Sequence, residues 1–122
     1  MLADDYIEVD RDDEAVDIYQ QLVKRYPKDV DVWLSYSNYY AMVEDFQQAC
    51  ELAKQGLVIL PDNPYLLYRI ANYCFLGQNI PQGIAYLQLA YRINADLANF
   101  FVDYDEEVMK ISEVVGIVNN EQ

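Results

Sequence analysis

The chain has 122 residues, enough for one domain, and carries a formal net charge of −13 at pH 7. Hydrophobic residues make up 53% of it and aromatic residues 14%, which argues against disorder and predicts a packed core. Histidine is absent, so the commonest general base and neutral metal ligand is missing, and Lys and Arg are too few and scattered for a nucleic-acid backbone site.

The acidic residues concentrate at both ends of the chain. Residues 1–14 contain seven acids and one base, and residues 96–122 contain the same numbers, so each end carries −6 while residues 15–95 carry −1. Two interpretations stay open: solvated polar ends of a repeat stack, or attraction of a basic partner. The sequence has no secretory segment and no apolar run of membrane-spanning length, so we expect a cytoplasmic protein.

Three helices are predicted in the first half of the chain. The first ends near Lys24 and Arg25, whose positive charges complement the helix dipole. Apolar residues at helical spacing then predict one helix over residues 29–43 and another over residues 45–60. Asp29 is a suitable N-cap for the earlier of these two.

The second half is also predicted to be helical. Asn63 followed by Pro64 marks the start of one helix, and Asn79 opens the next in a similar way. Seven apolar residues then form one helical stripe near the C-terminus: Leu97, Phe100, Phe101, Tyr104, Val108, Ile111 and Val115. A break near residues 103–105 would divide this capping segment into two helices. Since no segment alternates like a strand over a comparable length, the predicted fold class is all-α.

A spacing of 34 residues links these helices. Small residues lie one period apart at Ala15, Ala49 and Gly83, and the helix-terminating prolines Pro27 and Pro61 share the interval. Two antiparallel helices approach closely only where the side chains between them are small. The spacing therefore predicts a stack of helix pairs.

The middle unit resembles the tetratricopeptide repeat. That signature runs Trp-x2-Leu-Gly-x2-Tyr, then Ala-x3-Phe, then Pro. The matching positions here are Trp33, Tyr36, Ser37, Tyr40, Ala49, Ala53 and Pro61. Tyr36 and Ser37 depart from the leucine and glycine of the signature. Glu44 stands where a glycine usually precedes the turn, and in the next unit Gly77 comes one residue early.

The resemblance implies an α-solenoid of about 2.5–3 repeats in a single domain spanning residues 1–122. The expected units are residues 1–28, 29–62 and 63–95. A capping segment of one or two helices is expected over residues 96–118.

Proteins with these repeats hold a polypeptide in a groove lined by the first helix of each unit. The resemblance therefore implies a non-catalytic adaptor or assembly scaffold that needs no cofactor. The implied groove residues are Asp31, Leu34, Asn38, Met42, Tyr65, Tyr68, Arg69, Asn72 and Phe75. Arg69 is the only cation among them, so an apolar, aromatic or basic peptide is expected rather than an acidic one. Packing between neighbouring units is the alternative role of the tyrosines.

A self-associating module, or a fragment of a longer array, is the alternative function. Leu2, Tyr6 and Ile7, or the C-terminal stripe, would then form the contact. An enzyme is disfavoured by the missing histidine.

Two further constellations have structural interpretations. Cys50 and Cys74 lie in apolar helical contexts without a CxxC spacing, so we expect buried reduced thiols, with a disulfide or redox role as the alternative. The acidic run from Asp10 to Glu14 begins like a calcium loop, but Ala15 stands where the loop requires glycine. No metal site is therefore expected.

Overall fold

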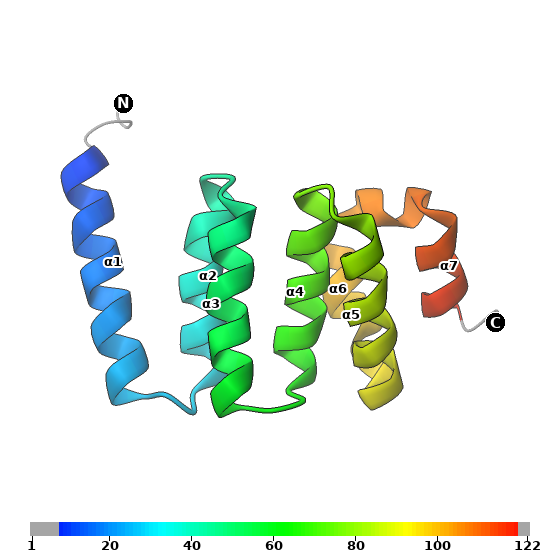
Figure 1. Cartoon of the computed structure of the whole chain (residues 1–122), viewed down its shortest axis with the longest axis horizontal. Coiled ribbons are helices and arrows are strands. Elements are labelled where there is room, and N and C mark those ends of the chain that lie inside the picture. The colour runs from blue at the N-terminus through cyan, green and yellow to red at the C-terminus, as the bar shows by residue number, and fades with distance from the viewer. Residues whose placement is uncertain (1–7, 120–122) are drawn as a thin grey trace.

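The computed structural model describes residues 8–119, with side chains from residue 13 onward. The described residues contain helices and no strand, which confirms the all-α class (Figure 1). The first five helices are α1 (Glu8–Arg25), α2 (Val30–Met42), α3 (Phe46–Ile59), α4 (Pro64–Leu76) and α5 (Ile80–Ile93). None of the helices in this part of the chain is both long and apolar enough to cross a membrane. Leu2, Tyr6 and Ile7 lie outside the described residues.

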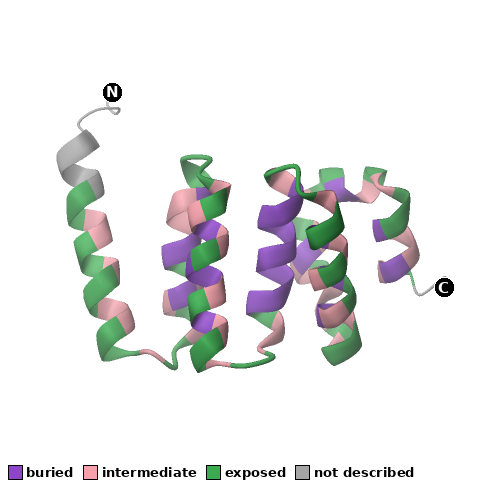
Figure 2. Ribbon diagram, in the orientation of Figure 1, coloured by how far each residue is buried: buried purple, intermediate pink, exposed green. Residues whose placement is uncertain are grey.

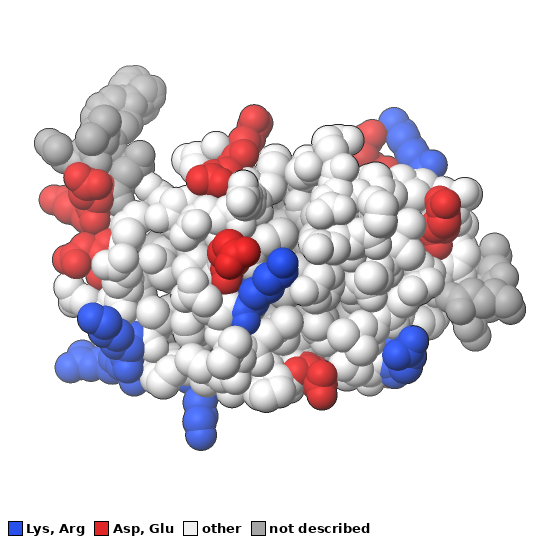
Figure 3. Space-filling model, in the orientation of Figure 1, with Lys and Arg blue, Asp and Glu red and all other residues white. Residues whose placement is uncertain are grey.

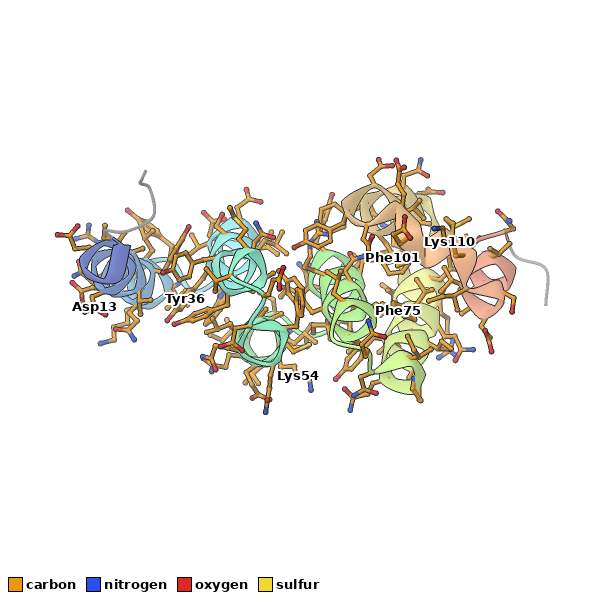
Figure 4. The ribbon with its side chains drawn as sticks, turned by 90° about the horizontal axis from the view of Figure 1, so that it is seen from above. Asp13, Tyr36, Lys54, Phe75, Phe101 and Lys110 are labelled. Atoms are coloured by element: carbon orange, nitrogen blue, oxygen red, sulfur yellow. The ribbon has the colours of Figure 1, made fainter. Side chains whose placement is uncertain are left out.

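The helices form antiparallel pairs that stack along one axis. α2 pairs with α3 and α4 pairs with α5, while α3 packs on α4 to join the two pairs. Seen along the helices, α2 lies on one side of the stack and α3 and α5 on the other, with α4 between them (Figure 4). We call the side of α2 the inner face and the opposite side the outer face. This arrangement is that of an α-solenoid.

Helix starts follow the predicted caps, with one exception. The Asp29 carboxylate accepts the Asp31 amide at 3.0 Å, and the Asn63 side chain accepts the Leu66 amide at 3.2 Å. Asn79 precedes α5 as expected but makes no side-chain capping bond. Local capping chemistry therefore sets most of the boundaries.

The core is centred on α4, where every residue from Leu66 to Phe75 is buried (Figure 2). One part of the core surrounds Trp33, whose indole N–H donates to the Pro27 carbonyl at 2.7 Å. The small Ala49 is fully buried in the same part. Burial of this extent makes α4 the element that holds the stack together.

The C-terminal segment contains η1 (Ala95–Leu97), α6 (Ala98–Tyr104), η2 (Glu106–Lys110) and α7 (Ser112–Val118). The helical segment is interrupted at Asp105, whose carboxylate accepts the Glu107 amide at 3.2 Å. α6 packs on α4 from the inner face, and α7 packs on α5. Phe101 and Val108 are consequently buried in the core. These two residues of the stripe are therefore not accessible for the external contact that the alternative function would need.

Helix α1 is attached more loosely than the others. From Asp13 onward it has no buried residue, and Ile18 is 56% exposed. Its main anchor is Tyr19, whose ring stacks on that of Tyr36 with centroids 5.2 Å apart. Figure 4 shows Tyr36 reaching from α2 into the space beside α1.

Candidate functional site

Four of the predicted groove residues lie on α2 and form one stripe along the inner face. Asp31, Leu34, Asn38 and Met42 are three or four positions apart, so the helical period aligns them. Asp31 is exposed, Leu34 and Asn38 are half-buried, and Met42 is 76% exposed. We call these four residues the α2 stripe.

The predicted residues on α4 are placed differently. Tyr65, in the first turn, remains 37% exposed. The other four are buried: Tyr68, Arg69, Asn72 and Phe75. The expectation that these four line an open groove therefore needs correction, because α6 lies over them.

Contacts of α4 with α6 and with Asn94, the residue that follows α5, account for this burial. The Tyr68 hydroxyl donates to the Asn94 carbonyl at 2.7 Å, and the Asn72 amide donates to the Phe101 carbonyl at 3.0 Å. The Phe75 and Phe101 rings meet with centroids 5.9 Å apart, and Figure 4 shows the two side chains between their helices. The Tyr68 hydroxyl and the Asn72 amide, which the sequence offered to a partner, are thus bonded within the chain.

Arg69 is held by aromatic rings and not by an acid. Its guanidinium carbon lies 4.0 Å from the centre of the Phe100 ring and 3.8 Å from that of Tyr104. Its Nη1 donates to the Asn72 side chain at 2.9 Å. No carboxylate of the described residues is within ion-pair distance. Burial lowers the pKa of Arg69, but the two ring faces stabilise the cation that burial disfavours.

Two tyrosines connect the helix pairs across the inner face. The Tyr104 hydroxyl donates to the side-chain oxygen of Asn38, which joins α6 to α2. The Tyr73 and Ser37 hydroxyls are 2.9 Å apart, which joins α4 to α2. Burial is the main cause that raises the pKa of both Tyr73 and Tyr104, so both hydroxyls are neutral near neutral pH.

The α2 stripe and an aromatic border therefore remain accessible on the inner face. Tyr65 and Phe100 form that border, with ring centroids 5.1 Å apart at an interplanar angle of 89°. On the outer face the charged side chains are few and of both signs, and the described residues form no basic cluster over α3 and α5 (Figure 3). The surface that combines apolar and aromatic side chains in one stripe is on the inner face.

Sequence reasoning missed the role of α6 in closing this surface. A usable signal was present, because the 34-residue spacing that relates Trp33 to Leu67 leads next to Phe101. Phe101 is fully buried against α4. Trp33 and Leu67 are likewise core residues, of the α2–α3 pair and the α4–α5 pair respectively. The segment after residue 95 thus continues the repeat in shortened form.

Within the part of the chain that the structure describes, no three Cys, Asp or Glu side chains are grouped to hold a metal ion. A cavity of about 310 Å³ lies between α3, α4 and α5 and is lined by Cys50, Cys74 and Lys54 but by no residue of the α2 stripe.

Comparison with known proteins agrees with the helical pairing. No family model matches the chain, and no solved structure matches it. A curated protein, interferon-induced protein with tetratricopeptide repeats 2 from Cricetulus griseus, is 26% identical over 76 residues. The match covers 62% of this chain but only 16% of that protein, so the chain spans a small part of its relative. This similarity and the paired helices support a tetratricopeptide-like protein, a class of protein-interaction modules in general.

Proposed function

We propose that the chain is a non-catalytic polypeptide-binding module and that its contact surface is the α2 stripe with the Tyr65–Phe100 border. The observation that carries the proposal is the exposed position of Asp31 and Met42 at the two ends of the α2 stripe, with the half-buried Leu34 and Asn38 between them. Met42 provides adaptable apolar contact area at the end of α2, and the rigid rings of Tyr65 and Phe100 lie toward the other end of the helices, where α2 and α4 begin (Figure 1). Asp31 adds a negative charge to the same face.

The polarity of the surface favours a basic or apolar ligand. Arg69, the only cation among the predicted groove residues, is enclosed by Phe100 and Tyr104 and cannot grip a carboxylate from solvent. Asn38 uses its oxygen to accept from Tyr104, which leaves its amide N–H groups to donate to a peptide carbonyl. We therefore expect an apolar or aromatic segment that carries Lys or Arg.

The experiment compares two exposed apolar residues. Met42→Arg places a cation on the α2 stripe, whereas Val58→Arg places one on α3 at a residue that is 80% exposed. The probes are short fluorescent peptides of matched apolar content, one set with lysines and one with glutamates. Met42→Arg should weaken binding of the lysine set by tenfold or more, roughly 1.4 kcal/mol, and Val58→Arg should leave it unchanged. Equal effects of the two variants, or tighter binding of the glutamate set, would contradict the proposal.

Self-association is a second candidate because of α1. Ile18 is 56% exposed and Leu22 is half-buried, so this helix presents apolar surface to solvent. A second copy is one partner that would cover this apolar surface. Sedimentation of the wild type over a concentration series, with Ile18→Lys as the comparison, tests this function, and a concentration-independent monomer would exclude it.

A further inference from the structure

The two cysteines of the chain meet on facing helices. Cys50 of α3 and Cys74 of α4 have their Sγ atoms 4.0 Å apart, and both thiols are free. They are the only cysteines in the sequence. Two sulfur atoms at this distance are in contact, and a disulfide of about 2.05 Å forms when the two side chains turn toward each other.

The pair is reachable from solvent. A cavity of about 310 Å³ at the junction of α3, α4 and α5 is lined by both cysteines, by Lys54 and by Gln82. Cys50 is half-buried, while Cys74 is 3% exposed and lies at the base of the cavity. Figure 4 shows Lys54 on the same side of the molecule, extending from α3. The cavity admits a small polar oxidant to both sulfur atoms.

The surroundings assign different roles to the two thiols. A hydrogen bond from Cys50 lowers the pKa of Cys74, and the charge of Lys54 lowers it further, against the effect of burial. The same hydrogen bond is the main cause that raises the pKa of Cys50, with burial adding to it. Cys74 is thus the sulfur of the pair that ionises first, and its thiolate is the nucleophilic form.

We propose that Cys50 and Cys74 form a redox-active dithiol, an oxidation site at which hydrogen peroxide produces an intramolecular disulfide. The Cys74 thiolate attacks one peroxide oxygen, the O–O bond breaks, and the departing hydroxide takes a proton to become water, which leaves a sulfenic acid on Cys74. The Cys50 sulfur then attacks the Cys74 sulfur, the S–O bond breaks, and the hydroxide released takes the Cys50 proton. In sum, two thiols lose two protons and two electrons, and one peroxide becomes two waters.

The bond would join two different helix pairs. Cys50 belongs to the α2–α3 pair and Cys74 to the α4–α5 pair, so the disulfide would fasten α3 to α4 along the seam between the pairs. Closure of the loop between them restricts the unfolded chain, which raises the melting temperature of the oxidised protein.

The test treats the reduced full chain with hydrogen peroxide, blocks remaining thiols with an alkylating reagent and measures the intact mass. We expect a monomer that has lost the mass of two hydrogen atoms, takes up no alkylating reagent and returns to the starting mass with dithiothreitol. Its melting temperature should exceed that of the reduced chain by roughly 5–10 °C. Since the chain has two cysteines, an oxidised monomer identifies the bond without further mapping.

Single variants test the assigned roles. Cys50→Ser should stop at a sulfenic acid on Cys74 that a dimedone probe labels, and Cys74→Ser should react with peroxide at least tenfold more slowly. Covalent dimers as the sole product, addition of oxygen to both sulfur atoms without disulfide, or no reaction of the wild type where free glutathione is oxidised would each overturn the proposal. The wild-type mass decides the matter even if a variant fails to fold.

Discussion

The hydroxyl of Tyr104 donates to the side-chain oxygen of Asn38 and connects two helices whose bonded residues are 66 positions apart in the sequence. Tyr104→Phe removes this bond while keeping the ring that covers Arg69. We expect the free energy of unfolding to fall by about 1 kcal/mol, since one side-chain hydrogen bond is lost and Asn38 keeps partial access to water. Urea denaturation measures the change. Tyr86→Phe is the matched control, because the hydroxyl of this half-buried tyrosine has no protein partner among the described residues, and a cost equal to that of Tyr104→Phe would contradict the prediction.

Arg69→Lys tests the aromatic enclosure of the guanidinium. Lysine keeps the charge but loses the planar group that stacks between Phe100 and Tyr104. We expect a loss of about 1–2 kcal/mol in unfolding free energy. Arg92→Lys, at an exposed position in the last turn of α5, should change stability little. The Arg69→Lys loss should be nearly the same at low and high salt, because no carboxylate pairs with Arg69, and a strong salt dependence would show that charge pairing had been overlooked.

Two glycines in helices provide a matched pair for packing. A Cβ at Gly83 would lie 3.0 Å from three ring carbons of Phe75, whereas a Cβ at Gly116 would meet no atom within 4 Å. Gly116→Ala should therefore stabilise the protein by up to about 1 kcal/mol through helix propensity. Gly83→Ala should lower stability by roughly 1 kcal/mol, because the buried Phe75 ring must shift. Thermal and urea unfolding compare the stability of the two variants. If Gly83→Ala raised the stability, the packing between α4 and α5 would have space for the added methyl group.

Tyr68 gives the protein a specific alkaline sensitivity. Burial raises the pKa of its hydroxyl to about 12 from the ordinary 10.0. The unfolded chain therefore releases this proton first, so the stabilising contribution is complete below pH 10 and is lost as the pH rises through 12. Unfolding free energies measured from pH 8 to about pH 11 should fall more steeply for the wild type than for Tyr68→Phe. Parallel slopes would show that Tyr68 ionises in the folded protein as readily as in the unfolded chain.

The helix pairs were predictable because their signals are local. Caps such as Asn63 and the recurrence of Ala49 and Gly83 depend on neighbours in sequence or on one fixed period. The open or closed state of the α4 face was not predictable in the same way. Tyr68 and Asn72 have the side chains of a binding surface, and only the position of α6 in space decides that they are covered.

The turns between paired helices show a second limit. Glu44 and Gln78, one period apart, both adopt a left-handed backbone with φ of 64° and 69°. Gly77, which a sequence reader would assign to that role, has an ordinary φ of −84°. A Cβ at Gly77 would instead lie 3.2 Å from the Tyr73 carbonyl oxygen. The glycine at position 77 identifies a turn in the sequence. The geometry of the helix end, however, determines that Gln78 and not Gly77 adopts the left-handed backbone.

Because α1 is loosely attached, local unfolding of the stack is expected to begin at the α1 end. A stack of helix pairs opens locally at a free-energy cost that depends on how much each helix buries against its neighbours. α1 lacks buried residues in its described part, whereas α4 is buried along most of its length. Amide hydrogens of α1 should accordingly exchange with solvent long before those of α4, so that structural opening begins at one end and advances inward. Mechanical force should separate α1 from α2 before it separates the other helices. A protease should likewise cleave α1 before the inner helices.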